Sequence, residues 1–285
     1  MATSHPHKKW MSETLYMDNL SIGDVVWPGT HNAGVDYDFS YPYLTLGENW
    51  FVCQRGPFIQ QLNEGARALD LRFYSNEHWV GVKKFETFHG PATGRSLSEL
   101  IRTLNFFLDE NPDEFILLDM HELMGTKRQS FDFKGFNSAI LEALGSRLIP
   151  KQNKYLTLGE LKKISNHQRI VLATRRHPDM DSPIFWPKIE HKWSGNDITS
   201  PDELKQHIAR TLKSPPSGAM PWSLSATSYE KLAGVKRIAK ELNEWFGPTS
   251  GWTPKCSIIN VDFLGDTLLV DYCREVNMAT GRNKH

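Results

Sequence analysis

The chain contains 285 residues, of which 33 are basic and 33 acidic, so its formal net charge is zero. This balance argues against the basic footprint of a nucleic-acid-binding protein. The length suits one large domain, and a hydrophobic content of 39% supplies a core. The polar N-terminus shows no signal peptide, and no apolar run approaches the length of a membrane-spanning helix. We therefore expect a soluble protein, either cytoplasmic or the mature form of an exported one.

The first quarter of the chain contains two predicted strands and one helix. Residues 1–20 are expected to form an N-terminal arm or short helix, followed by a strand at 24–27 that Pro28 and Gly29 end. Residues 35–51 hold several aromatic side chains without a period and are predicted to form a loop. Apolar residues at helical spacing predict a helix over 54–64, and a strand follows at 66–73.

The rest of the chain continues this alternation. A capping signature at Ser96–Glu99 begins a predicted helix that Asn111–Pro112 ends. The other predicted helices span 136–144, 158–164, 201–212 and 229–246, and the other predicted strands span 80–88, 114–120, 169–174, 222–226 and 256–263. Residues 178–200 look irregular, and 275–285 look like a frayed tail. Strands alternate with helices without a long linker, so we predict an α/β fold with one distorted (β/α)8 TIM barrel over residues 1–285.

Two histidines follow short apolar runs and lie on either side of a charged strand. WPGTHNAG at 27–34 presents His31 and Asn32, ALDLRFY at 68–74 carries Asp70 and Arg72, and ETFHGP at 86–91 presents His89. Barrels of this class build their sites at the carboxyl ends of strands. Two imidazoles that titrate near neutrality, with a carboxylate and an arginine, suit phosphoryl transfer by paired acid–base catalysis.

Each residue also has a simpler interpretation. A histidine after a Pro-Gly turn is usually an ordinary surface residue, and Asp70 with Arg72 could form a buried structural pair. Asp262, after the last strong strand, could be a turn residue, and Arg175 could lie at a solvated strand end. The order and spacing of the two histidine motifs favour catalysis over these alternatives.

The motifs resemble the X-domain of the phosphatidylinositol-specific phospholipases C. The resemblance covers roughly residues 20–125, through GTHNAG, GARALDLRFY, FHGP and NPDEFILLDM. It implies a distorted TIM barrel that cleaves the phosphodiester of phosphatidylinositol or another inositol phospholipid at a membrane surface, and we expect a monomer. By that resemblance His31 is the general base, His89 is the general acid, and the products are diacylglycerol and a cyclic inositol phosphate.

The resemblance also assigns supporting roles. Asp262 would fix the tautomer of His31, Asp70 would orient Arg72 or His89, and Arg72 would hold the phosphate where calcium-dependent members carry an acidic ligand. No metal or other cofactor is therefore predicted. Asn32 departs from this pattern, because metal-independent members carry aspartate there. If calcium is used, its ligands would be Asn32, Asp70 and Asp119.

The predicted substrate contacts are less closely matched to the family. Arg175 follows RIVLAT, where bacterial enzymes use an arginine on inositol hydroxyls, and Glu190 or His191 lies near their acidic contact. Asp119 and His121 alternate on one face of a strand, so both side chains are expected at the barrel mouth. Cys53, Cys256 and Cys273 lack C-x-x-C spacing, which argues against a disulfide framework and a zinc site.

Two other functions stay open at this stage. One is a related barrel phosphodiesterase, such as a glycerophosphodiesterase or a sphingomyelinase-D-like enzyme, which would need a metal ion. The other is a non-catalytic barrel that binds inositol phosphates or lipids. Contact with lipid is expected from the aromatic loop at 37–51 or from Phe185 and Trp186.

Overall fold

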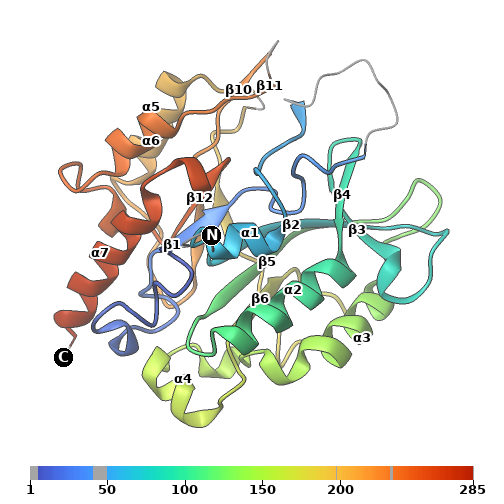
Figure 1. Ribbon diagram of the computed structural model, residues 1–285. Helices are drawn as coiled ribbons and strands as arrows, with labels where there is room; N and C mark the ends of the chain where they lie inside the picture. The colour runs from blue at the N-terminus through green and yellow to red at the C-terminus, as the bar shows by residue number, and fades with distance from the viewer. Residues whose placement is uncertain (1–5, 41–49, 197, 232–233, 285) are drawn as a thin grey trace, which may run out of the picture.

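The computed structural model describes residues 6–40, 50–196, 198–231 and 234–284, and these build one curled, mainly parallel sheet with helices outside it (Figure 1). Neighbouring strands along the main path of the sheet are all parallel and follow one another in chain order. They are β1 (Trp27–Thr30), β2 (Ala68–Ser75), β5 (Ile116–Met124), β6 (Ile170–Thr174), β7 (Trp186–Pro187), β8 (Glu190–Lys192), β9 (Trp222–Ser225) and β12 (Ile258–Val261). This is the strand order of a TIM barrel, so the predicted fold class is confirmed.

The two ends of the sheet meet in one stretch of chain. β7 pairs with β6 and β8 pairs with β9, both in parallel. Only Lys188 and Ile189 separate β7 from β8, so residues 186–192 cross from one edge of the sheet to the other. Among the described residues no helix stands between β6 and β7 or between β7 and β8. This shortened segment, which the sequence pattern left as irregular, is the distortion of the barrel.

The helices lie outside the strands. They are α1 (Phe58–Asn63), α2 (Leu97–Glu110), α3 (Phe133–Leu144), α4 (Leu158–Ile164), α5 (Pro201–Thr211), α6 (Ala239–Phe246) and α7 (Leu269–Arg282). Helices α2, α3, α4 and α5 begin at side-chain caps. Ser96 caps α2 by accepting a hydrogen bond from the backbone of Glu99, as its capping signature predicted. Thr157 and Ser200 form capping boxes at α4 and α5. No helix of the described residues is long and apolar enough to cross a membrane.

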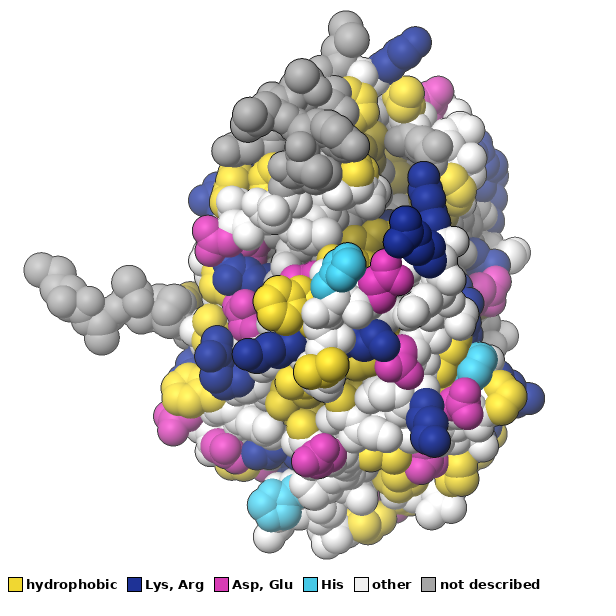
Figure 2. Space-filling model, turned by 90° about the vertical axis from the view of Figure 1, so that its right-hand side faces the viewer, with side chains coloured by type: hydrophobic (Ala, Val, Ile, Leu, Met, Phe, Trp, Pro, Cys, Tyr) yellow, Lys and Arg dark blue, Asp and Glu magenta, His cyan; other side chains and the backbone are white. Residues whose placement is uncertain are grey.

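Four further strands and several 3-10 helices accompany these elements in the described residues. The remaining strands are β3 (Phe85–His89), β4 (Ala92–Ser96), β10 (Tyr229–Glu230) and β11 (Gly234–Val235). The 3-10 helices are η1 (Met17–Asn19), η3 (Gly81–Lys84), η4 (Gly145–Arg147), η5 (Lys151–Asn153), η6 (Thr253–Lys255) and η7 (Leu264–Asp266). Seen from the β3 side, the surface intersperses basic, acidic and apolar side chains, in keeping with the zero net charge (Figure 2).

Four local predictions were wrong. The expected strand at 24–27 begins only at Trp27, and β1 continues through Pro28 and Gly29 because both residues pair with β12. The expected strand at 80–88 starts later, because Gly81 turns with φ 62° and η3 precedes β3, which pairs antiparallel with β2. The expected helix at 229–246 starts only at Ala239, because Gly234 has φ 75° and pairs with Glu230 in the β10–β11 hairpin. Tertiary contacts overrode the local helical pattern in this segment.

The frayed tail expected at 275–285 is instead the second half of α7, which extends to Arg282. The buried side chain of Asn277 accepts a hydrogen bond from the backbone N–H of Val26 at 2.8 Å and donates one to its carbonyl at 3.0 Å. A Cβ at Gly281 would lie 2.2 Å from the carbonyl oxygen of Tyr16, so this helix packs closely on the N-terminal arm. The polar composition of residues 275–285 led to the wrong prediction, because this part of α7 packs on the rest of the protein.

A buried ion pair joins the N-terminal arm to the barrel. Arg67 is fully buried and donates to Glu114 Oε2 from Nε at 2.9 Å and from Nη2 at 2.7 Å. Glu114 also accepts the backbone N–H groups of Met11 and Ser12, and Arg67 donates to the carbonyl of Lys8. The pair therefore satisfies backbone groups of the arm as well as its own charges.

Replacing one partner should destabilise the fold strongly. In Glu114→Gln the guanidinium of Arg67 keeps its charge in a buried site without a counter-ion, so the free energy of unfolding should fall by about 3–5 kcal/mol. The exposed pair of Lys205 and Glu244 gives the control, and Glu244→Gln should cost less than about 1 kcal/mol. Urea unfolding of both variants measures the difference, and equal losses would contradict this account.

Candidate active site

Strand register brings three polar residues together at the carboxyl end of the sheet. Thr30 of β1 pairs with Val261 of β12 and with Leu69 of β2. The next residues along these strands are His31, Asp262 and Asp70, so parallel pairing sets the three side by side. This juxtaposition follows from the barrel topology that the sequence predicted.

His31 is held by two polar partners. Its Nδ1 lies 2.8 Å from Asp262 Oδ1, and both residues are only 7% exposed. A carboxylate can only accept here, so Nδ1 carries the proton and Nε2 keeps its lone pair. The Nη2 group of Arg72 donates to that Nε2 at 2.9 Å. The imidazole is therefore held in the tautomer that a general base requires, with Arg72 over its basic nitrogen.

Asp70 forms an ion pair with the guanidinium of Arg72. Its Oδ2 accepts from Asn260 Nδ2 at 3.2 Å and from Arg72 Nη2 at 3.5 Å, and it lies 4.0 Å from His31 Nε2. Burial would raise the pKa of Asp70, but the charge of Arg72 opposes burial and holds that pKa well below its ordinary value. Asp70 is therefore a buried anion beside a cation, and the pair supports His31 directly.

His89 faces His31 from the end of β3. The two rings are perpendicular, with centroids 6.1 Å apart. His89 Nδ1 donates to the carbonyl of Phe51 at 3.0 Å. The other ring nitrogen, Nε2, is therefore the one that can exchange a proton with a substrate. Burial, followed by repulsion from His31, lowers the pKa of His89 to about 3. In the free protein this imidazole is neutral at pH 7.

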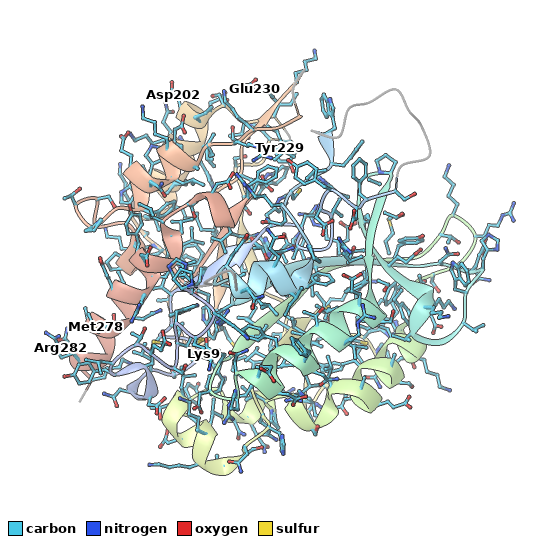
Figure 3. The ribbon with its side chains drawn as sticks, viewed as in Figure 1. Lys9, Asp202, Tyr229, Glu230, Met278 and Arg282 are labelled. Atoms are coloured by element: carbon cyan, nitrogen blue, oxygen red, sulfur yellow. The ribbon has the colours of Figure 1, made fainter. Side chains whose placement is uncertain are left out.

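Both histidines line one cavity of about 670 Å³ at the carboxyl end of the barrel. Tyr229 lines it as well, with its ring centroid 6.4 Å from that of His31 and 6.1 Å from that of His89. Figure 3 shows Tyr229 in the upper part of the molecule and Lys9, on the N-terminal arm, in the lower half. Sequence reasoning missed Tyr229 because it assigned this residue to a helix.

Cys53 and Gln54 are further site residues that the sequence analysis passed over. Cys53 Sγ lies 3.5 Å from His89 Nδ1 and 3.7 Å from the hydroxyl of Tyr229. The side chain of Gln54 donates to the backbone carbonyls of His31 and Val261 at 2.9 and 3.0 Å. Neither residue belongs to a recognisable motif, and only the fold brings them to the site.

Asp119, His121 and His191 form a second polar cluster, of which His121 and His191 line the cavity. Asp119 and His121 project from β5, where the pairing with β2 skips His121 and forms a bulge. His191 projects from β8 and its Nε2 lies 2.5 Å from Asp119 Oδ2. Burial raises the pKa of Asp119. Burial would lower the pKa of His191, but the contact with Asp119 outweighs burial and raises that pKa. Asp119 and His121 thus lie on one side of β5, as their alternation predicted, but only His121 lines the cavity.

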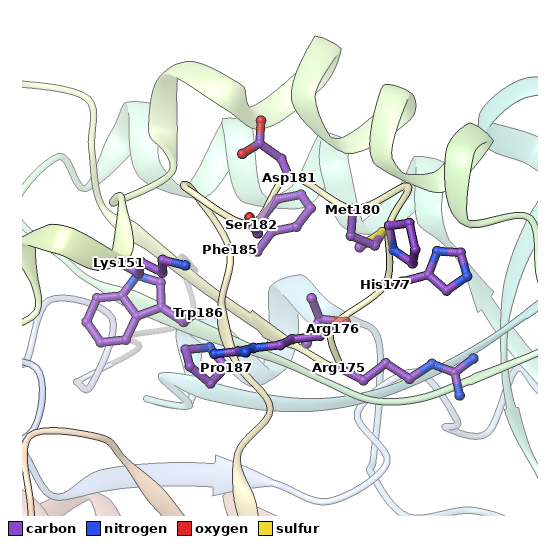
Figure 4. Close-up of a pocket in the computed structure, with 12 residues that line it drawn as sticks. Lys151, Arg175, Arg176, His177, Met180, Asp181, Ser182, Phe185, Trp186 and Pro187 are labelled. Carbon is purple, nitrogen blue, oxygen red and sulfur yellow. The ribbon is translucent and has the colours of Figure 1, made fainter.

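Two predicted substrate contacts lie elsewhere. Arg175 lines a separate cavity of about 380 Å³, where its guanidinium stacks 4.6 Å from the ring of Phe133 and points away from Trp186 (Figure 4). Glu190 is exposed and pairs with Lys192, because alternate side chains of β8 face opposite sides and His191 takes the inner one. Neither residue lines the cavity that contains the two histidines, and both predictions were wrong in placement.

Asn32 turns the chain after His31 with φ 48°, and its side chain is buried. Both amide atoms lack a hydrogen-bond partner among the described residues. Calcium would need oxygen ligands from Asn32, Asp70 and Asp119, but the guanidinium of Arg72 already lies 3.5 Å from Asp70. Because the guanidinium of Arg72 is a fixed cation beside the Asp70 carboxylate, it repels a calcium ion there. These residues therefore do not fit a calcium site.

The predicted lipid contacts are also partly corrected. Phe185 and Trp186 are buried, and the indole N–H of Trp186 donates to the carbonyl of Ile149 at 2.8 Å. They support the barrel and are not available to a membrane. Most of the aromatic loop expected at 37–51 falls outside the described residues.

Solved structures with this fold come from bacterial phospholipases. A phosphatidylinositol-specific phospholipase C of Staphylococcus aureus superposes with a TM-score of 0.69 at 16% identity, covering 94% of this chain and 96% of that one. The enzyme of the same name from Listeria monocytogenes superposes with a TM-score of 0.64 at 20% identity, covering 95% and 98%. The chain therefore has the distorted-barrel fold of the phosphatidylinositol-specific phospholipases C.

Sequence comparison leads to the same group of proteins. The chain is 28% identical over 215 residues to a variant-surface-glycoprotein phospholipase C of Trypanosoma cruzi, covering 66% of this chain and 55% of that protein. It is 30% identical over 128 residues to a 1-phosphatidylinositol phosphodiesterase of Listeria monocytogenes, covering 45% and 36%. The chain thus spans about half or less of the length of these relatives. No family model matches it.

The buried state of His89 should make stability depend on pH. Its pKa of about 3 in the folded protein lies below the ordinary value of 6.5, so the unfolded chain binds more protons between these values. Stability from this group is complete above pH 6.5 and falls as the pH drops through that value. His89→Gln should therefore lessen the loss of unfolding free energy between pH 7 and pH 5 by about 2 kcal/mol.

Urea unfolding at the two pH values measures this difference. His78→Gln, at an exposed position, is the matched control and should leave the pH dependence unchanged. If His89→Gln and His78→Gln show the same loss between the two pH values, His89 does not titrate as the site geometry requires.

Proposed function

We propose that this protein is a phosphatidylinositol-specific phospholipase C that cleaves an inositol phospholipid to diacylglycerol and a cyclic inositol phosphate. The observation that carries the proposal is the pair of imidazoles that face one cavity with ring centroids 6.1 Å apart. Each has one nitrogen fixed by a partner, Asp262 for His31 and the Phe51 carbonyl for His89. This arrangement leaves His31 able to accept a proton and His89, once protonated, able to donate one to the same bound phosphodiester.

The reaction divides between the two histidines. His31 Nε2 accepts the proton of the inositol 2-hydroxyl while that oxygen attacks the phosphorus and closes a five-membered cyclic ester. The bond from phosphorus to the glycerol oxygen breaks, and the Nε2–H of protonated His89 gives its proton to the departing oxygen. The negative phosphodiester favours the charged form of His89, which burial disfavours in the free protein.

Arg72 supplies the positive charge that this reaction needs. In the free site its Nη2 group donates to His31 Nε2 at 2.9 Å. A bound phosphodiester competes for the guanidinium, which frees Nε2 to accept the substrate proton. The planar guanidinium can then hold two phosphate oxygens and stabilise the charge that develops on them. We expect this step to need no metal ion.

The test is the release of cyclic inositol phosphate from phosphatidylinositol vesicles in excess chelator. The wild-type protein should release it, and His31→Ala and His89→Ala should each lose at least about 100-fold in turnover while remaining folded. Product that forms only with added magnesium or calcium would favour a related metal-dependent phosphodiesterase. Binding of inositol phospholipid without any product would favour a non-catalytic lipid-binding barrel.

Arg72→Lys should keep the charge but lose the fork geometry. A lysine ammonium is a point charge, so it cannot hold two phosphate oxygens in one plane, and turnover should fall about 100-fold or more. Arg237→Lys is a matched control, because Arg237 is exposed and pairs with Asp266 outside the catalytic cluster. Turnover by Arg72→Lys that equals wild type would remove the bidentate role.

Exposed apolar side chains at the rim of the cavity suit contact with a membrane. Trp193 and Ile198 line the cavity and are 51% and 48% exposed. Trp193→Ala should therefore reduce turnover on vesicles about 5-fold or more but leave turnover on a soluble short-chain substrate nearly unchanged. Phe106→Ala, at a 57% exposed position on α2, is the control. Equal losses on both substrates would assign Trp193 to substrate binding alone.

A further inference from the structure

Asp119, His121 and His191 form a cluster beside the catalytic site, and His121 and His191 line the same cavity as the catalytic histidines. Each offers one ligand atom, and these atoms all lie within 4.8 Å of one another. The rings of His121 and His191 have centroids 4.0 Å apart, and His191 Nε2 lies 2.5 Å from Asp119 Oδ2. The three residues come from β5 and β8, two strands of the barrel.

Polar atoms of this cluster remain without partners. Asp119 is 3% exposed, yet its Oδ1 has no hydrogen-bond partner among the described residues, and neither has the buried Nδ1 of His121. An orphaned carboxylate oxygen in a buried site is costly unless a ligand satisfies it. A dication would satisfy the free oxygen of Asp119.

We propose that Asp119, His121 and His191 bind one divalent transition-metal ion of the zinc type, and that the bound ion inhibits turnover by occupying the cavity. Two imidazoles and one carboxylate are a common ligand set for zinc, which keeps a fourth position for water or another ligand. Zinc bonds of about 2.1 Å place tetrahedral ligands roughly 3.4 Å apart. The His191–Asp119 contact must therefore open by roughly 1 Å, and the ion takes the place of the proton between them.

A second cluster, His31 with Cys53 and Asp262, is less suited to the ion. The guanidinium of Arg72 lies 2.9 Å from His31 Nε2, so a fixed positive charge already covers that ligand atom. Burial also raises the pKa of Cys53 well above its ordinary value, which opposes the thiolate that a metal requires. The cysteine spacing that argued against a zinc site does not apply to the Asp119 cluster, because this set contains no cysteine.

Inhibition follows from position. His121 and His191 line the same cavity as His31 and His89, so an ion held by them reduces the space for the inositol ring. The ion also offers the phosphate an alternative to Arg72 and draws it away from His31. Inhibition by the ion rests on the proposed phospholipase C function, whereas binding of the ion does not.

Equilibrium dialysis with Zn²⁺, followed by metal analysis, tests binding without any substrate. The wild-type protein should hold about one ion per chain, and His191→Gln should bind at least about 10-fold more weakly. His177→Gln is the control, because His177 stacks on Phe133 outside the cavity, and it should bind as wild type does. Unchanged binding by His191→Gln would overturn the proposal.

Cobalt substitution identifies the ligands, because thiolate ligation gives an intense near-ultraviolet band that nitrogen and oxygen ligands do not give. The proposal predicts visible bands without that thiolate band, and Cys53→Ser should leave the spectrum unchanged. A thiolate band that disappears in Cys53→Ser would move the ion to the His31 cluster and overturn the assignment.

Vesicle turnover measured against Zn²⁺ occupancy tests inhibition. Turnover should fall in proportion to occupancy and return with chelator. Full turnover with the ion bound would remove the inhibitory half, and a protein that binds zinc but never cleaves lipid would refute the proposed function and leave the metal site standing.

Discussion

The parallel pairing of β1 with both β12 and β2 is the constraint on which the site depends. Register sets Thr30 beside Val261 and beside Leu69, so the next residue of each strand emerges at the same edge. His31 thus lies beside both Asp262 and Asp70, and no long loop is needed to position the three residues. Sites built on the ends of strands hold their geometry more closely than sites built on loops, which suits proton transfer over hydrogen-bond distances.

Two buried pairs of opposite charge support the fold and the site. At one end of the sheet, Arg67 and Glu114 fix the N-terminal arm through backbone groups that they also satisfy. At the other end, Asp70 and Arg72 place a guanidinium over the basic nitrogen of His31. The first pair serves stability. The second carries residual unpaired atoms, such as Arg72 Nε, that a phosphodiester can satisfy.

Motifs that lie at the ends of strands were predictable, and residues placed by chain reversals were not. The sequence indicated the barrel, both histidines, Asp70, Arg72 and Asp262, because apolar runs define strands and strand ends meet in such folds. It misplaced Glu190, since one-residue register decides which face a side chain takes, and Arg175, which packs on Phe133. Tyr229 was out of reach, because the hairpin depends on Gly234 and on pairing that no local pattern reveals.

The division of roles between the two histidines is tested most directly by changing the leaving group. His31→Ala and His89→Ala are each assayed on phosphatidylinositol, whose departing alkoxide needs a proton, and on an inositol phosphate ester of p-nitrophenol, whose phenolate leaves without one. This account predicts that His89→Ala loses far less turnover on the nitrophenyl ester than on the lipid, whereas His31→Ala loses turnover on both. Equal losses by His89→Ala on the two substrates would contradict its role as the acid.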